Sequence, residues 1–237
     1  MTVIDDAVKA HGGLDRWLAV TSLSAQVSIG GSLWADKGHD GVLADAAVFI
    51  DPHREQVEFS GFGPQRLRTR FEPRLVTVRT EDGTEIGRRR DPRASFPQDA
   101  AAPWDDIQVV YFASYAICNY LTLPFLLTAP GVEVTELEPW PAADPSWRRV
   151  RADFGKAPIE THNRVQYYNF DSNLLVRHDY DADVLGGAPA SNQAADYREF
   201  GGLLFPTCRR VTARDSDGAA GTGPILVSID FGDITVG

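Results

Sequence analysis

Residues 107–131 read IQVVYFASYAICNYLTLPFLLTAPG and carry no charged side chain. The stretch is long enough to span a bilayer, but Asp105 and Asp106 precede it, Glu133 follows it, and no basic residue sets an orientation. The apolar run is also interrupted by Gln108, Ser114, Asn119 and Pro124. We therefore expect a buried helix from about Trp104 to Thr122 and no stable insertion into a membrane.

On both sides of this helix the chain alternates apolar and polar residues, as strands do in a sheet with one wet face. Short turn-rich spacers separate most of the segments, which favours antiparallel pairing of neighbours. The expected strands cover residues 23–29, 46–51, 54–60, 66–71, 75–80, 84–89, 132–140, 146–154, 164–170, 174–185, 193–200, 203–213 and 225–236. No repeat or linker divides the chain. The sequence thus predicts one domain, residues 1–237, mainly β (α+β), with a large antiparallel sheet wrapped around the inserted apolar helix.

The composition excludes some classes of partner. A formal net charge of −10 repels phosphate backbones, so we expect no nucleic acid. Cys118 and Cys208 have neither CxxC spacing nor a neighbouring histidine, so we expect free thiols. No zinc-protease, nucleophile-elbow or dinucleotide motif occurs, and neither a metal nor a cofactor is expected. The first residues, MTVIDDAVKAHGG, are acidic where an export signal is basic, which leads us to expect a cytoplasmic protein.

Three segments near the ends carry a resemblance to a known family. They are AHGGLDRW at 10–17, SLSAQVSIGG at 22–31 and DYREFGGLLFPTCRRV at 196–211. Together they resemble the opening and closing pieces of LolA-like proteins, the lipoprotein carriers and related lipid-binding proteins. The resemblance implies an open antiparallel half-barrel closed by helices over an apolar cavity, and it assigns no catalytic residue. The chain differs in its longer uncharged central helix, and we expect it to lack the export signal of the periplasmic carriers.

Residues 174–185, LLVRHDYDADVL, separate into an apolar and a charged set. With a period of two, one face carries Leu174, Val176, His178, Tyr180, Ala182 and Val184, and the other carries Leu175, Arg177, Asp179, Asp181 and Asp183. We expect the charged face to lie in water, which places His178 and Tyr180 in the core or against a cavity. The aspartates then form a solvated edge rather than a calcium site.

The role of His178 has two interpretations, because a buried imidazole needs partners for its ring nitrogens. In the first, it bonds a buried carboxylate or carbonyl and only stabilises the sheet. In the second, it exchanges protons near neutral pH beside Tyr180.

The partner of His178 depends on the register of the next strand. In an antiparallel pair, the numbers of two opposite residues always add up to the same sum. If that sum is even, Asp196 and Arg198 share the face of His178. If it is odd, Tyr197 and Glu199 share that face. The set that contains Tyr197 is the more apolar of the two, which slightly favours the odd register. Glu199 is therefore our candidate for a third catalytic group.

One face of the expected helix carries Trp104, Ile107, Tyr111, Ser114, Tyr115 and Cys118 at three- and four-residue spacing. The opposite face is also apolar, so both sides of the helix should be covered. Core packing explains this pattern, and the alternative is a pocket in which hydroxyl groups orient an apolar ligand. The candidate ligand-binding residues are Trp104, Tyr111, Ser114, Tyr115, Cys118 and Tyr197.

The leading functional hypothesis is the binding of a small hydrophobic or lipid-like molecule in an apolar cavity under the helix. The alternative is a cofactor-independent lyase, isomerase or hydrolase that uses His178 and Tyr180 for acid–base chemistry on such a molecule. A third class, a scaffold that pairs its sheet edge with another chain, has no feature of its own. The oligomeric state is not predicted.

Overall fold

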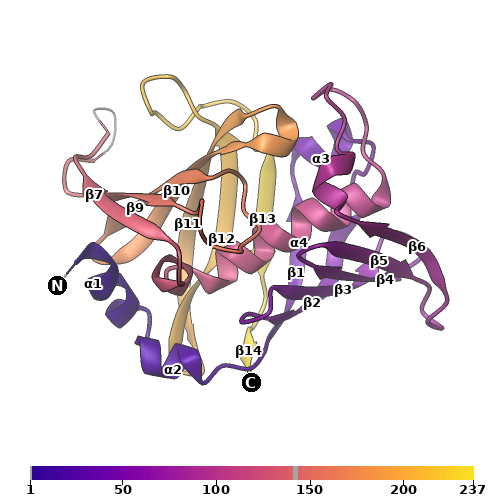
Figure 1. The fold of residues 1–237 in the computed structure, drawn as a ribbon, viewed down its shortest axis with the longest axis horizontal. Helices are drawn as coiled ribbons and strands as arrows, with labels where there is room; N and C mark the ends of the chain where they lie inside the picture. Colours follow the sequence, from indigo (N-terminus) through magenta and orange to yellow (C-terminus); the bar gives the residue numbers. More distant parts are fainter. Residues whose placement is uncertain (1, 141–143) are drawn as a thin grey trace.

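The computed structural model describes residues 2–140 and 144–237, and its strands form one open antiparallel sheet (Figure 1). The strands are β1 (Leu23–Gly30), β2 (Leu43–Asp51), β3 (Gln56–Phe62), β4 (Leu67–Glu72), β5 (Leu75–Arg79), β6 (Glu85–Arg90), β7 (Glu133–Leu137), β8 (Arg148–Asp153), β9 (Val165–Asp171), β10 (Leu174–Ala182), β11 (Ala188–Phe200), β12 (Leu203–Ala213), β13 (Val227–Phe231) and β14 (Thr235–Val236). Their order is β6-β5-β4-β3-β2-β1-β13-β12-β11-β10-β9-β8-β7, and β14 pairs with β1. The strands that precede the central helix and those that follow it therefore meet where β1 pairs with β13.

The sheet curves around one long helix, α4, which crosses its concave side in Figure 1. The helical segments are α1 (Val3–Ala10), α2 (Leu14–Leu18), α3 (Ser32–Asp36), η1 (Pro92–Ser95), α4 (Asp106–Thr122), η2 (Phe125–Thr128) and η3 (Asp183–Leu185). This architecture confirms the predicted half-barrel of α+β class with its inserted helix.

Side chains satisfy the backbone groups at both ends of α4. The Asp105 carboxylate accepts the Gln108 N–H at 2.9 Å, and the Gln108 side chain accepts the Asp105 N–H at 2.8 Å. At the other end, Pro124 has no N–H to offer the Tyr120 carbonyl. The Arg209 guanidinium donates to that oxygen instead, at 2.9 Å. These contacts hold the helix within two residues of the predicted bounds.

Every residue of α4 from Ile107 to Thr122 is buried, because the sheet wraps around the helix. Strands β3 to β6 contact it on one side, and the 3-10 turns η1 and η2 pack near its two ends. In the part of the chain that the structure describes, no helix combines the length and apolarity needed to cross a bilayer.

The expected exposure of the charged face of β10 is wrong for two of its charged residues. The pairing of β9 with β10 shifts between Leu175 and Arg177, and the side chains of Arg177 and Asp179 are only 5% and 0% exposed. Their Nε and Oδ1 atoms form an ion pair at 2.7 Å, and Arg177 also donates to the Gly218 carbonyl. The loop around Gly218 thus covers this outer face, which local periodicity cannot reveal. Asp181 remains partly exposed, as expected.

The turn expected over residues 186–192 is shorter than predicted. Gly186 and Gly187 adopt positive φ angles of 70° and 80°, directly after η3, and β11 already begins at Ala188. The early start lengthens the pairing of β10 with β11.

Candidate functional site

The space expected beneath the helix is filled by side chains, so the prediction of an apolar ligand cavity there is wrong. His178 and Tyr180 point inward as predicted and are 0% and 3% exposed. The hollow that remains beside Tyr120 and Tyr180 has a volume of about 10 Å³. A void needs about 10–15 Å³ to hold a single water molecule. An apolar ligand therefore has no room next to His178.

The residue that fills this interior is His162, from the loop between β8 and β9, residues 154–164. Its ring stacks on Tyr180 at 3.6 Å between centroids. Its Nδ1 lies 3.2 Å from the Tyr115 hydroxyl, and its Nε2 lies 3.0 Å from the Tyr120 hydroxyl. Burial, and next the nearby Arg93 guanidinium, hold the pKa of His162 well below its ordinary value. The imidazole is therefore neutral and bridges α4 to the sheet.

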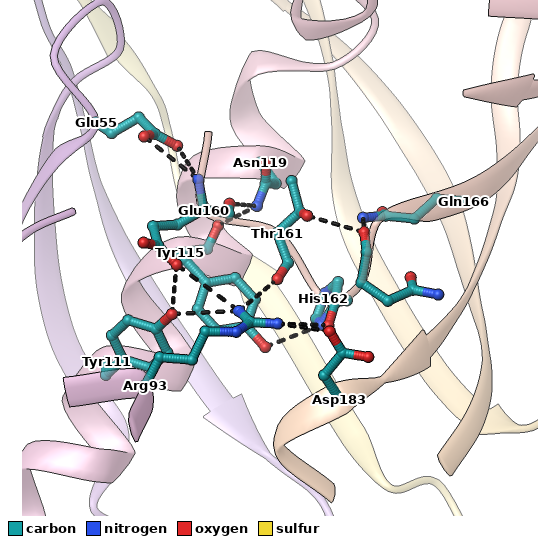
Figure 2. Close-up of polar contacts among 11 residues, drawn as sticks. Glu55, Arg93, Tyr111, Tyr115, Asn119, Glu160, Thr161, His162, Gln166 and Asp183 are labelled. Atoms are coloured by element: carbon teal, nitrogen blue, oxygen red, sulfur yellow. Dashed lines mark hydrogen bonds and ion pairs between the residues drawn. The ribbon is translucent and has the colours of Figure 1, made fainter. Parts of the chain in front are cut away.

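Arg93, from η1, fastens the β8–β9 loop in this position (Figure 2). Its guanidinium donates to the carbonyl oxygens of Thr161 at 2.8 Å and His162 at 3.1 Å, and to the Asp183 carboxylate at 2.9 Å. Five donors in one rigid plane suit arginine to this kind of multiple contact. The loop is consequently tied both to η1 and to η3.

Glu160 extends the same network to Glu55 in the β2–β3 turn (Figure 2). Its carboxylate accepts the Tyr111 hydroxyl at 2.5 Å, and its carbonyl accepts the Asn119 amide at 2.8 Å. Its backbone N–H donates to the Glu55 carboxyl group at 3.2 Å. Glu55 is the last residue of the β2–β3 turn and has a positive φ of 49°. Two distant turns thus meet at the end of α4.

The sequence interpretation missed Glu55, Arg93, Glu160 and His162. One signal was present, because the expected strands 146–154 and 164–170 left a connection longer than the usual hairpin loop of about 2–5 residues. Long loops within a domain are often functional. Nothing in the local pattern, however, shows that this loop enters the interior.

His178 occupies a closed environment. Its Nε2 lies 2.6 Å from the Gln166 side-chain oxygen, and its ring stacks on Tyr168 at 4.4 Å. Burial, followed by the proximity of His162 and Arg209, keeps the pKa of His178 well below its ordinary value. The neutral ring therefore donates its Nε2 proton to Gln166.

The register preference for the strand after His178 is wrong. His178 pairs with Asn192, an even sum, so the odd register does not occur. Tyr197 and Glu199 lie farther along β11, beyond its pairing with β10, and Glu199 is exposed and opposite Leu204. Asp196 and Arg198 lie in the same outer part of β11. None of these four residues is brought to His178.

Tyr197 is half-buried and contacts β10 and the end of α1. Its hydroxyl donates to the Leu175 carbonyl at 2.7 Å, and its ring meets His11 edge to face at 5.5 Å. The contact joins β11 to β10 and to the end of α1.

The five candidate ligand-binding residues on and beside the helix are all buried. Trp104 packs against Phe96 at 5.1 Å between ring centroids, and Tyr111 and Tyr115 bond the β8–β9 loop. Ser114 and Cys118 are 0% and 3% exposed. The structure brings these residues together in the core, and none of them lines an open groove.

An apolar groove with a volume of about 530 Å³ lies at one end of the half-barrel. Its walls come from α2, the β2–β3 and β4–β5 turns, the end of α4, η2 and the β8–β9 loop. The lining residues are Leu14, Trp17, Leu18, Pro52, His53, Arg54, Glu55, Pro73, Thr122, Phe125, Leu126, Thr128, Ala129, Pro130, Pro158 and Ile159. We call this feature the apolar groove.

The apolar groove has a rigid aromatic wall and an exposed apolar rim. Trp17 stacks on Phe125 at 4.6 Å with an interplanar angle of 4°, and both are nearly buried. Leu14 and Leu18 on the rim are 39% and 62% exposed. Four prolines stiffen the surrounding turns. The groove is therefore a preformed apolar surface open to solvent.

A second cleft, of about 590 Å³, lies between the α3–β2 and β3–β4 connections. Its lining is rich in glycine and includes Asp40, Asp45, Arg66 and Asp106. It is separate from the β8–β9 loop and the apolar groove, and it shares no residue with either.

Comparison with known proteins identifies the fold. No family model and no curated protein matches the chain. Among solved structures, a LolA superfamily protein from Nitrosomonas europaea superimposes with a TM-score of 0.57 at 10% identity, covering 99% of this chain and 92% of that one. A putative outer membrane lipoprotein-sorting protein domain from Vibrio parahaemolyticus gives 0.47 at 7% identity, covering 94% and 89%. The chain has a LolA-like fold, as the sequence resemblance implied.

Proposed function

We propose that this protein binds a small lipid-like molecule and holds its apolar chain in the apolar groove. The observation that carries the proposal is the groove itself. Its volume of about 530 Å³ lies within the range of about 300–1,000 Å³ that is usual for small-molecule sites. Its aromatic wall and prolines are already in place, so binding orders little of the protein.

The exposed rim supports an apolar ligand. Leu14 and Leu18 expose apolar surface. Each Å² of such surface that a ligand removes from water contributes about 25 cal/mol of favourable free energy. An apolar chain that lies against both leucines and against Trp17 removes such surface on the protein and on itself. The LolA-like fold adds support, because the resemblance to that family implies an apolar ligand.

No specific observation on the described residues supports the acid–base alternative. His178 and Tyr180 are enclosed by packed rings, and a substrate has no space beside them. The overall charge of −10 also favours a ligand other than a nucleic acid.

The test is displacement of a neutral fluorescent probe, N-phenyl-1-naphthylamine, by 1-dodecanol. We expect probe binding to the wild type, and at least a severalfold loss of probe affinity in Leu18→Gln. The matched control is Ile86→Gln, since Ile86 is 53% exposed but lies on the edge strand β6, away from the groove. Equal affinity in both variants, or no binding to the wild type, would exclude this function.

A further inference from the structure

Glu55 gives the apolar groove a polar end. Glu55 lines the groove. Its carboxyl group reaches the backbone of Glu160, where the β2–β3 turn meets the β8–β9 loop (Figure 2). Its carboxyl oxygens receive only one donor among the described residues, the Glu160 N–H, at 3.2 and 3.5 Å. This carboxyl group, on a residue that lines the groove, therefore retains unused hydrogen-bonding capacity.

No cation neutralises Glu55 in the part of the chain that the structure describes. The neighbouring Arg54 is 74% exposed and its Nε lies 3.7 Å from Asp51. Arg93 pairs with Glu160 and Asp183. Within residues 2–140 and 144–237, no arginine, lysine or histidine nitrogen lies within 4.0 Å of the Glu55 carboxyl oxygens.

The charges that face Glu55 come from three elements. Its own turn contributes Asp51 from the end of β2, together with His53 and Arg54, and the β8–β9 loop contributes Glu160. From α4, the buried thiol of Cys118 is near enough for the Glu55 charge to add to the rise in its pKa, of which burial is the main cause. Burial is the main cause that raises the pKa of Glu55, to about 8, and the Glu160 carboxylate adds to it. At neutral pH the group is therefore largely a neutral carboxylic acid.

The other hydroxyl donors in the groove are already used. The Thr122 hydroxyl donates to the Cys118 carbonyl at 2.8 Å, and the Thr128 hydroxyl donates to the Phe125 carbonyl at 2.8 Å. A protonated Glu55 offers one O–H donor and keeps acceptor lone pairs that the Glu160 N–H does not use. A carboxylate on the ligand, placed at Glu55, would instead lie near the Glu160 carboxylate, whose charge already adds to the rise in the pKa of Glu55. Like charges at low dielectric repel strongly.

We propose that the Glu55 carboxyl group binds the uncharged polar end of the ligand, a hydroxyl or an ester carbonyl, while the apolar chain lies along Trp17 and Leu18. The ligand is then a neutral long-chain molecule rather than a fatty-acid anion. The inference rests on the proposed function of the groove and adds the chemistry of the ligand's polar end.

The experiment compares ligands with the same chain by displacement of N-phenyl-1-naphthylamine. The set is 1-dodecanol, methyl dodecanoate, dodecanoate and dodecylammonium. At pH 6.5 we expect dodecanol and the ester to bind at least about tenfold more tightly than dodecanoate, which corresponds to about 1.4 kcal/mol. Raising the pH to 9.5 ionises Glu55 and should weaken dodecanol binding severalfold.

Variants of Glu55 separate this inference from the proposed function. Glu55→Gln keeps a neutral donor and acceptor, so dodecanol should still bind and the pH dependence should disappear. Glu55→Ala should bind the probe but lose the preference for dodecanol over dodecanoate. The control Glu58→Gln, on the exposed face of β3 where Glu58 pairs with Arg70, should behave as wild type.

Three results would overturn the inference while leaving the groove function intact. These are equal or tighter binding of dodecanoate or dodecylammonium at pH 6.5, an unchanged pH dependence in Glu55→Gln, and an unchanged preference in Glu55→Ala. Failure of every dodecyl compound to displace the probe would instead count against the proposed function itself.

Discussion

Replacing His162 with alanine should destabilise the protein strongly, because its ring fills the interior of the half-barrel. The ring is fully buried, stacks on Tyr180 and bonds the hydroxyl groups of Tyr115 and Tyr120. The stacking contributes about 0.5–1.5 kcal/mol, and each hydroxyl left buried without a partner costs about 1–3 kcal/mol. Tyr120 also contacts the Tyr180 hydroxyl at 3.0 Å, which limits the second cost. We expect a total loss of about 3–5 kcal/mol, the range for removing a buried ring.

The assay is equilibrium unfolding in guanidinium chloride, followed by fluorescence and circular dichroism. The matched control is His53→Ala, because His53 is exposed and meets Trp17 only edge to face. It should cost less than about 1 kcal/mol. Free imidazole at ten times its dissociation constant should restore about 1.4 kcal/mol to the His162 variant by refilling the void. A loss below 1 kcal/mol in His162→Ala would refute the inserted position of this loop.

Three further predictions concern the buried ion pair, the β8–β9 loop held by Arg93, and the buried histidines. Asp179→Ala leaves Arg177 buried without its carboxylate and should cost about 3–5 kcal/mol in the free energy of unfolding, measured by denaturation; a change below 1 kcal/mol would contradict the buried pair. Arg93→Gln removes the donors to the carbonyls of residues 161 and 162. Hydrogen exchange of the backbone amides over residues 158–163, measured by mass spectrometry, should therefore accelerate at least about tenfold. Unchanged rates would be inconsistent with a role of Arg93 in holding the β8–β9 loop. Stability should also fall as the pH drops below about 6.5. The buried histidines with depressed pKa are His11, His162 and His178. The unfolded chain takes up protons that these folded rings exclude, so each ring contributes up to about 1.4 kcal/mol of lost stability per pH unit. His178→Gln should reduce the slope of stability against pH. An identical slope in this variant would argue against a neutral buried ring.

Local sequence patterns were sufficient to predict the sheet and its central helix. Alternation from Leu23 onward marked strands with one buried face, and the uncharged stretch after Asp106 marked a helix covered on both sides. The Asp105–Gln108 capping contacts and Pro124 fix its ends through chemistry that neighbouring residues carry. Such features can be predicted because each depends on few positions.

The interior and the candidate site depend on contacts between distant segments. Arg177 and Asp179 are buried because the loop around Gly218 covers them, and no alternation pattern contains that information. His162 reaches Tyr180 because Arg93, far earlier in the chain, holds its loop inward. The same loop displaces the expected cavity, so the apolar groove forms at the end of the half-barrel instead.

The most direct measurement of the central claim is quenching of tryptophan fluorescence by 12-bromo-1-dodecanol. Trp17 lines the apolar groove, whereas Trp34 and Trp104 pack around Phe112 in the interior. Bromine quenches only at close range, so ligand in the groove should quench Trp17, and Trp17→Phe should abolish most of the saturable quenching while preserving binding. Saturable quenching that persists unchanged in Trp17→Phe would place the ligand elsewhere and contradict the account.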